Sequence, residues 1–219
     1  MDKNYLYQNF TVPNILDLAL QRMKGKDADV FTPSGLCCFC GVQGSGKTLS
    51  AVLYLKRLMT LFPKSICVSN ISLNFYTDRV QPYTGVEQLN AIENGKYGVI
   101  FMLDEIQIEF NSLESKQMNT PIFELVCQQR KQRKHIIGTT QTFGRLAKPF
   151  REQFKNVVLC NNVLKTFFIQ KIFSAENVAT EDDIKVELKP MYTKLYIPSP
   201  SDFTLYDTYQ QVKRIRKGF

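Results

Sequence analysis

Apolar residues along the chain form short runs that alternate with longer stretches of helical spacing. The runs expected to be strands of a central sheet are residues 36–40, 65–69, 97–104, 135–140 and 156–160. The helices expected near them are residues 47–62, 85–93, 120–134 and 145–154. Strands that alternate with helices are typical of an α/β protein, so we expect three layers around a mainly parallel sheet.

Both ends of the chain differ in pattern from this alternating middle. Residues 14–25 have helical spacing and predict an N-terminal helical accessory within residues 1–34. Later short strands are expected at residues 163–173, 184–188 and 191–197. The chain shows no internal repeat and no low-complexity linker. We therefore expect one domain, with a core at residues 35–161 and a small β-rich C-terminal elaboration with a basic tail at residues 162–219.

The first expected strand runs into a glycine-rich segment, residues 41–48, with the sequence Gly-Val-Gln-Gly-Ser-Gly-Lys-Thr. This is the complete G-x-x-x-x-G-K-[ST] pattern of a phosphate loop, in the strand-to-helix context that the pattern requires. The backbone amides of such a loop and the following helix N-terminus bind phosphate oxygens. The predicted nucleotide contacts are Gly41, Gln43, Gly44, Ser45, Gly46, Lys47, Thr48 and Leu49. The alternative is a glycine-rich turn that arose by chance.

Four side chains are predicted to divide the chemistry of ATP and Mg²⁺ between them. Lys47 is expected to reach the β- and γ-phosphates, and Thr48 to ligate Mg²⁺. Asp104 and Glu105 end an apolar run, and in a parallel sheet that end lies beside the phosphate loop. Asp104 is therefore predicted to hold the Mg²⁺ shell and Glu105 to activate the attacking water. In the alternative interpretation, both acids only cap the following residues or face solvent.

A further strand end is expected to face the γ-phosphate. The apolar run at residues 135–140 ends in Thr139, Thr140 and Gln141. An intervening strand with a terminal polar side chain is the layout of the additional-strand, catalytic-glutamate class of phosphate-loop ATPases. Gln141 is therefore the predicted sensor of the γ-phosphate. Its alternative role is to begin the loop that follows the strand.

Composition indicates the setting in which this chemistry takes place. A chain of 219 residues with 44% hydrophobic content can bury a sizeable core in one domain. No N-terminal signal pattern and no apolar run of membrane-spanning length is present, so we expect a soluble, cytoplasmic protein. The six cysteines lie in apolar or helical segments, which favours reduced thiols. Cys37, Cys38 and Cys40 could suggest a metal site, but neighbours on one strand point to opposite faces, so core packing is favoured.

Basic residues are in excess, and the formal net charge is +8. One cluster contains Arg130, Lys131, Arg133 and Lys134, and a second occupies residues 213–217. Either cluster could bind nucleic-acid phosphates, and the first could instead complement the negative C-terminal end of its predicted helix. The charge fits a nucleic-acid partner without requiring one. His135, the only histidine, is expected to pack or cap at a strand start.

The acid pair Asp104-Glu105, the basic segment 129–135, the sequence Thr139-Thr140-Gln141 and the arginines that follow together resemble the FtsK/HerA superfamily. Within it, residues 36–160 are most similar to the zonula-occludens-toxin-like assembly proteins of filamentous phages and the packaging ATPases of small membrane-containing viruses. The resemblance implies a RecA-like core that assembles into a ring, hydrolyses ATP between subunits and moves DNA through its centre. Toxin-like assembly proteins usually carry a transmembrane segment after the ATPase core, and its absence here favours a soluble packaging motor.

The resemblance also implies that an arginine from a neighbouring subunit completes each site. The candidates are Arg130, Arg133, Arg145 and Arg151. Arg130 and Arg133 have two alternative roles, as DNA contacts or as part of a solvated helix face. Sequence does not rank the four.

We therefore expect an ATP-driven DNA translocase, a viral or mobile-element packaging motor that acts as a homo-oligomeric ring in the host cytoplasm or with the virion. Its expected partners are DNA and a capsid or portal protein. Conjugative and partitioning ATPases are motors of the same class and differ from packaging ATPases only in biological setting. Two other classes stay open, an ATP-gated interaction protein and a small-molecule kinase. DNA-stimulated turnover separates the motor from the gated protein. Against the kinase, this chain has no obvious arginine-rich lid to close over a second substrate.

Overall fold

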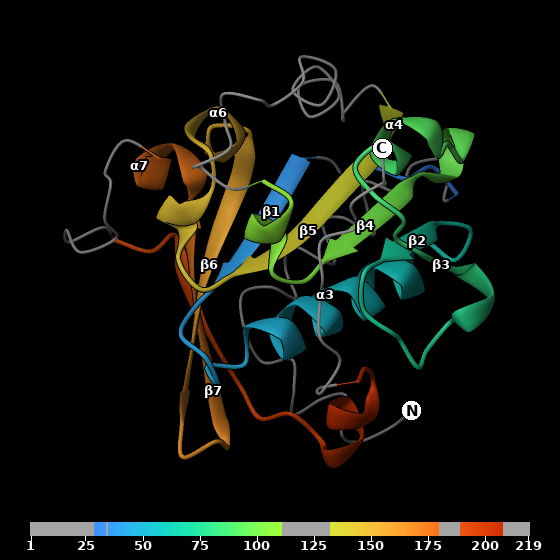
Figure 1. Cartoon of the computed structure of the whole chain (residues 1–219). Coiled ribbons are helices and arrows are strands. Elements are labelled where there is room, and N and C mark those ends of the chain that lie inside the picture. The colour runs from blue at the N-terminus through green and yellow to red at the C-terminus, as the bar shows by residue number, and fades with distance from the viewer. Residues whose placement is uncertain (1–28, 34, 111–131, 180–188, 208–219) are drawn as a thin grey trace.

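The structure is a computed structural model that describes residues 29–33, 35–110, 132–179 and 189–207. These residues form an eight-stranded sheet in the order β3-β2-β4-β5-β1-β6-β7-β8 (Figure 1). The strands are β1 (Gly35–Cys40), β2 (Ile66–Ser69), β3 (Val80–Pro82), β4 (Val99–Leu103), β5 (Lys134–Thr140), β6 (Phe154–Val163), β7 (Phe167–Ser174) and β8 (Tyr192–Tyr196). Pairing is parallel from β3 to β6 and antiparallel for β6 with β7 and β7 with β8. The predicted α/β fold with a mainly parallel sheet is confirmed.

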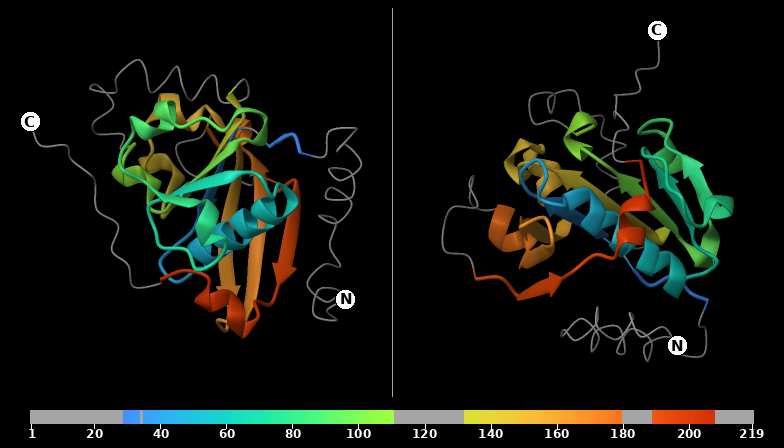
Figure 2. Two further views of the ribbon diagram at one scale, coloured as in Figure 1. Left: turned by 90° about the vertical axis from the view of Figure 1, so that its right-hand side faces the viewer. Right: turned by 90° about the horizontal axis from the view of Figure 1, so that it is seen from below.

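Helical elements cover both faces of this sheet and make the three predicted layers. The helices are α3 (Lys47–Leu61), α4 (Gln88–Ala91), α6 (Lys148–Arg151) and α7 (Ala175–Ala179). Short 3-10 turns are η1 (Thr77–Arg79), η2 (Gly95–Tyr97), η3 (Ile106–Ile108), η5 (Phe143–Arg145) and η6 (Pro200–Thr204). On one face, α3 and residues next to η6 bury a core layer, and Figure 2 shows α3 lying across the strands. The other core layer includes residues of α4, η3, η5, α6 and α7.

The alternation of side chains along β1 assigns its cysteines to the two core layers. Cys38 and Cys40 belong to the layer opposite α3, while Cys37 and Phe39 pack in the layer against α3. All three thiols are free and buried, and burial raises the pKa of Cys37 and Cys38 above the ordinary thiol value. The prediction of core packing is confirmed.

Two predicted helices are shorter than expected. The helix expected at residues 85–93 is reduced to α4 at Gln88–Ala91. The helix expected at 145–154 is replaced by η5, by α6 and by the start of β6 at Phe154. A helix that began at Arg145 would place Pro149 in its interior, where proline has no N–H to donate; instead it lies in the first turn of α6.

The boundaries of the C-terminal strands also differ from the predicted ones. Strand β6 runs through the expected core boundary at residue 161, and the expected strand 163–173 is divided by a turn. Leu164 and Lys165 have left-handed φ angles of 56° and 53°, which reverse the chain between β6 and β7. Strands β7 and β8 therefore extend the same sheet, and β8 agrees with the strand expected at 191–197.

Several predictions lie outside the described residues. They are the helix at 14–25, the helix at 120–134 up to residue 131, the strand at 184–188 and the basic tail at 213–217. No helix of the described ranges combines the length and apolar character needed to cross a bilayer.

Candidate nucleotide-binding site

The phosphate loop joins β1 to α3 at the carboxyl end of the parallel strands. Gly44 and Gly46 have left-handed φ angles of 78° and 84°, and Gly46 is the N-cap of the 15-residue α3. Gly46 also has no room for a side chain, since an added Cβ would lie 2.3 Å from the ring of Phe168 in β7. At Gly41, an added Cβ would lie 2.6 Å from the carbonyl oxygen of Cys160 in β6. The loop is thus pressed against the β6–β7 hairpin, with the free amides of the α3 N-terminus at its centre.

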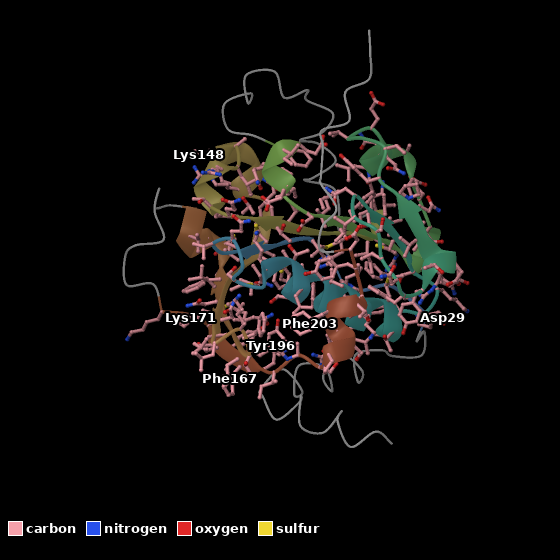
Figure 3. All side chains as sticks on the ribbon, turned by 60° about the horizontal axis from the view of Figure 1, so that its bottom comes forward. Asp29, Lys148, Phe167, Lys171, Tyr196 and Phe203 are labelled. Carbon is pink, nitrogen blue, oxygen red and sulfur yellow. The ribbon has the colours of Figure 1, made fainter. Side chains whose placement is uncertain are left out.

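Polar and apolar anchors hold the loop and leave one polar atom unused. The Asn162 amide of β6 donates a hydrogen bond to the Gly44 carbonyl. The buried Leu49 side chain packs with Phe168 and Tyr196, so only its main chain is left for a nucleotide. The rings of Tyr196 and Phe203, both labelled in Figure 3, each lie against the ring of Phe168.

The unused atom is the hydroxyl of Ser45. It is buried and has no hydrogen-bond partner among the described residues. A buried hydroxyl without a partner is costly, whereas a phosphate oxygen on the loop would accept a hydrogen bond from it. The Ser45 hydroxyl without a partner, together with the glycine geometry of the loop, fits a bound triphosphate.

Asp104 directly follows β4 and points to the start of α3. The Thr48 hydroxyl donates to Asp104 Oδ1 at 2.9 Å, and the Thr139 hydroxyl donates to the same oxygen at 2.7 Å. Burial raises the pKa of Asp104, while the bonds from Thr139 and Thr48 oppose that shift. A hydroxyl and a carboxylate in contact are oxygen donors of the kind that Mg²⁺ prefers, so Thr48 and Asp104 fit a magnesium site.

Glu105 follows in a left-handed conformation with φ of 51°. Its N–H donates to the Thr139 hydroxyl at 2.9 Å, so Thr139 contacts both acidic residues. Its carboxylate Oε1 lies 3.3 Å from Lys47 Nζ, and Oε2 accepts a hydrogen bond from the Gln107 amide. The Glu105 carboxylate therefore lies directly opposite the loop lysine.

The sheet order explains why these groups meet. Strand β5 is inserted between β1 and β4, so the loop after β1, the acids after β4 and the threonines of β5 share one edge. Close packing at Gly138, whose added Cβ would lie 2.7 Å from Ile106, brings the turn after Glu105 onto β5. Prediction missed Thr139 as a site residue, although the Thr-Thr-Gln strand end pointed to it. Gln141 is exposed and lies just past β5, at the same edge.

The structure describes three of the four candidate arginines. Arg133 precedes β5 at its opposite end, where its guanidinium donates to the Phe31 carbonyl at 3.0 Å. Arg145 is exposed at the end of η5, and Arg151 is buried at the end of α6. Arg130 is not among the described residues. A role in a neighbouring subunit stays a prediction for all four.

Lys134 corrects one prediction. It is the first residue of β5, is buried, and donates from Nζ to the carbonyls of Leu89 and Asn90 at 2.8 and 3.1 Å. Burial lowers its pKa, and its charge faces the C-terminal end of α4. The prediction that Lys134 could contact nucleic-acid phosphates is therefore wrong. Next to it, His135 is buried and its Nε2 lies 3.2 Å from the Tyr54 hydroxyl, in agreement with a packing role.

Solved structures share the fold of this chain. The N-terminal domain of zonular occludens toxin from Neisseria meningitidis matches with a TM-score of 0.56 and 16% identity, covering 80% of this chain and 99% of that chain. The DNA-packaging ATPase B204 from Sulfolobus turreted icosahedral virus matches with a TM-score of 0.53 and 13% identity, covering 77% and 99%. The genome packaging NTPase B204 of Sulfolobus turreted icosahedral virus 2, in complex with ATP-gammaS, matches with a TM-score of 0.52 and 15% identity, covering 76% and 98%.

This chain has the fold of the P-loop packaging ATPases. At these identities the likeness establishes the fold, and the chain spans almost the full length of each match. No protein-family model and no curated protein sequence matches the chain. The expected resemblance in fold to toxin-like and packaging ATPases is confirmed.

Proposed function

We propose that this protein hydrolyses ATP and uses the hydrolysis to move DNA, as a homo-oligomeric packaging or assembly motor of a virus or mobile element. The observation that carries the proposal is the contact between the two motifs, with Thr48 bound to Asp104 at 2.9 Å and Lys47 beside Glu105 at 3.3 Å. Hydrolysis needs phosphate binding, a metal position and a base at one place, and these four side chains supply them.

In the proposed hydrolysis, some residues bind the triphosphate and another accepts a proton from water. When the triphosphate binds, the Lys47 ammonium leaves the Glu105 carboxylate and pairs with phosphate oxygens, because it cannot neutralise both anions at once. Glu105 is then free to accept a proton from water. The loop amides and the Ser45 hydroxyl hold the phosphates in place. Mg²⁺, held by Thr48 and Asp104, would neutralise phosphate charge when bound.

The proposed movement of DNA is supported by the fold and by the charge of the chain. Two observations support it: viral proteins of the same fold package genomes, and the net charge of this chain is +8. A ring would also supply the arginine that the sequence pattern leads us to expect from a neighbouring subunit. In the described part of the chain, Lys47 is the cation that faces the acid pair, so a second cation would come from elsewhere.

The experiment is ATP turnover across a series of protein concentrations, without DNA, with single-stranded DNA and with duplex DNA. Lys47→Ala protein serves as the control for contaminating ATPase. We expect the rate per chain to rise with protein concentration and with at least one form of DNA. A rate that depends on neither would rule out the ring motor while leaving ATP hydrolysis in place.

A second candidate is an ATP-gated interaction protein, which binds a partner in one nucleotide state without moving DNA. The observation that favours it concerns two of the four residues of the first basic cluster: Lys134 and Arg133 donate hydrogen bonds to backbone carbonyls of this chain. DNA binding across a salt series separates the two candidates, since each neutralised phosphate lowers log K by roughly 0.7 to 0.9 per tenfold salt increase. Absence of binding at low salt favours the gated protein. A steep slope that flattens when residues 213–217 are neutralised favours the motor.

A further inference from the structure

Asn70 lies immediately after β2 and holds the backbone of Asp104 from the side opposite to β5. Its Oδ1 accepts a hydrogen bond from the Asp104 N–H at 2.8 Å, and its Nδ2 donates to the Asp104 carbonyl at 2.9 Å. The carboxamide thus replaces, with one side chain, the ladder that would have continued between β2 and β4. Both polar groups of the Asp104 main chain are satisfied at the point where β4 ends.

Asparagine is suited to this double contact. Its side chain combines one acceptor and one donor in a plane, as a peptide group does, whereas a carboxylate only accepts and a hydroxyl cannot span both groups. The half-buried contact lies beside the turn into Glu105, whose φ of 51° is unfavourable for a residue with a side chain. Fixing the preceding residue stabilises that turn.

Asn70 is itself held rigidly. Its N–H donates to the Met102 carbonyl at 3.2 Å, and on either side of it the Ser69 hydroxyl bonds to the main chain of Ile71. Ile71 and Leu73 are buried in the core layer against α3. At the far end of this segment the Asn74 N–H donates to the Leu205 carbonyl at 2.8 Å. A side chain that positions a reactive group must have little freedom of its own, and Asn70 meets that condition.

We propose that Asn70 is a positioning residue for ATP hydrolysis, which fixes the main chain of Asp104 so that the Glu105 carboxylate is aimed at the attacking water. Thr139 performs the matching task from β5, through the Glu105 N–H and the Asp104 carboxylate. The acid pair is thereby held between the ends of β2 and β5. The inference rests on the proposed hydrolysis and concerns how the catalytic turn is held.

The test compares Asn70→Ala with Asn74→Ala, a matched control in the same segment. Asn74 lies four residues after Asn70 in the chain, is exposed, and its amide donates to the Thr204 carbonyl instead of to Asp104. For Asn70→Ala we expect kcat to fall by roughly tenfold to a hundredfold, because small misplacements of catalytic groups have effects of that order. Nucleotide affinity, measured with a fluorescent ATP analogue, should stay within about threefold, because the loop is unchanged. Asn74→Ala should retain kcat.

The outcomes separate this inference from the proposed function. Absence of turnover in the wild-type protein refutes the proposed function, whereas a variant-to-wild-type ratio near one for kcat refutes only the role of Asn70. Equal losses in Asn70→Ala and Asn74→Ala would show general loosening of the segment and also refute it. If Asn70→Ala does not fold, Asn70→Asp decides. It keeps the acceptor and loses the donor, so reduced kcat with retained nucleotide affinity supports the role and unchanged kcat contradicts it.

Discussion

Both ends of β5 carry polar residues, but in the described part of the chain their partners differ. At the N-terminal end, Lys134 and Arg133 give their hydrogen bonds to main-chain carbonyls of neighbouring segments. At the C-terminal end, Thr139 bonds to both acids, while Glu105 and Lys47 form an ion pair that a phosphate could replace. Buried polar groups with satisfied partners stabilise a fold, and those with exchangeable partners can do chemistry.

The sharpest test of this difference is Lys47→Ala, which we expect to impair both nucleotide binding and turnover. The ammonium contacts Glu105 and is not part of an apolar layer, so the fold should persist. Triphosphate binding should weaken, and turnover should fall by at least about a hundredfold, as for loss of a charge-stabilising group. Nucleotide titration, turnover and circular dichroism measure the three effects. Near-normal turnover in the folded variant would falsify the site.

Glu105→Gln separates chemistry from binding at the same end of β5. We expect MgATP affinity to be kept and turnover to fall by roughly a hundredfold to ten-thousandfold, the range for loss of a general base. Single-turnover hydrolysis and equilibrium binding provide the measurement. Parallel losses of binding and turnover would instead place Glu105 in the metal shell.

Thr139→Val removes one hydroxyl at little cost in volume and tests whether β5 holds the acids. We expect turnover to fall by about tenfold, because Asp104 and Glu105 each lose a partner. The matched control is Thr140→Val, since the Thr140 hydroxyl donates to the Thr142 carbonyl and not to an acid. Steady-state kinetics of both variants give the comparison, and equal effects would remove the special role of Thr139.

Lys134→Met tests the other end of β5, where we expect the smallest effect on activity. The carbonyls of Leu89 and Asn90 lose their donor, which should lower the free energy of unfolding by about 1–3 kcal/mol. Turnover should stay within about twofold, and the salt slope of DNA binding should not change. Urea unfolding, turnover and the salt series provide the measurements. A changed slope at retained stability would restore Lys134 as a phosphate contact.

Local patterns predicted most of the fold correctly and failed where distant segments compete. Strands β1, β4 and β5 were visible as apolar runs because both of their faces are buried. Phe154 was assigned to a helix, but its ring packs 5.3 Å from those of Phe143 and Phe150, which favours its place in β6. Helical spacing does not encode such contacts, so tertiary packing overrode the local prediction.

The sequence alone determined the phosphate loop and the acid pair, because each is a contiguous motif whose chemistry depends on neighbouring residues along the chain. Only the tertiary structure decided which polar residues serve those motifs. Thr139 and Asn70 lie 35 and 34 residues from Asp104 in sequence, and the hydrogen bonds that join them to it arise from the order of β2, β4 and β5. Lys134 shows the same rule in reverse, since a basic residue in a charged run became a buried structural donor when β5 paired with β4. The pairing of strands is set by burial over the whole sheet, and no short segment contains it.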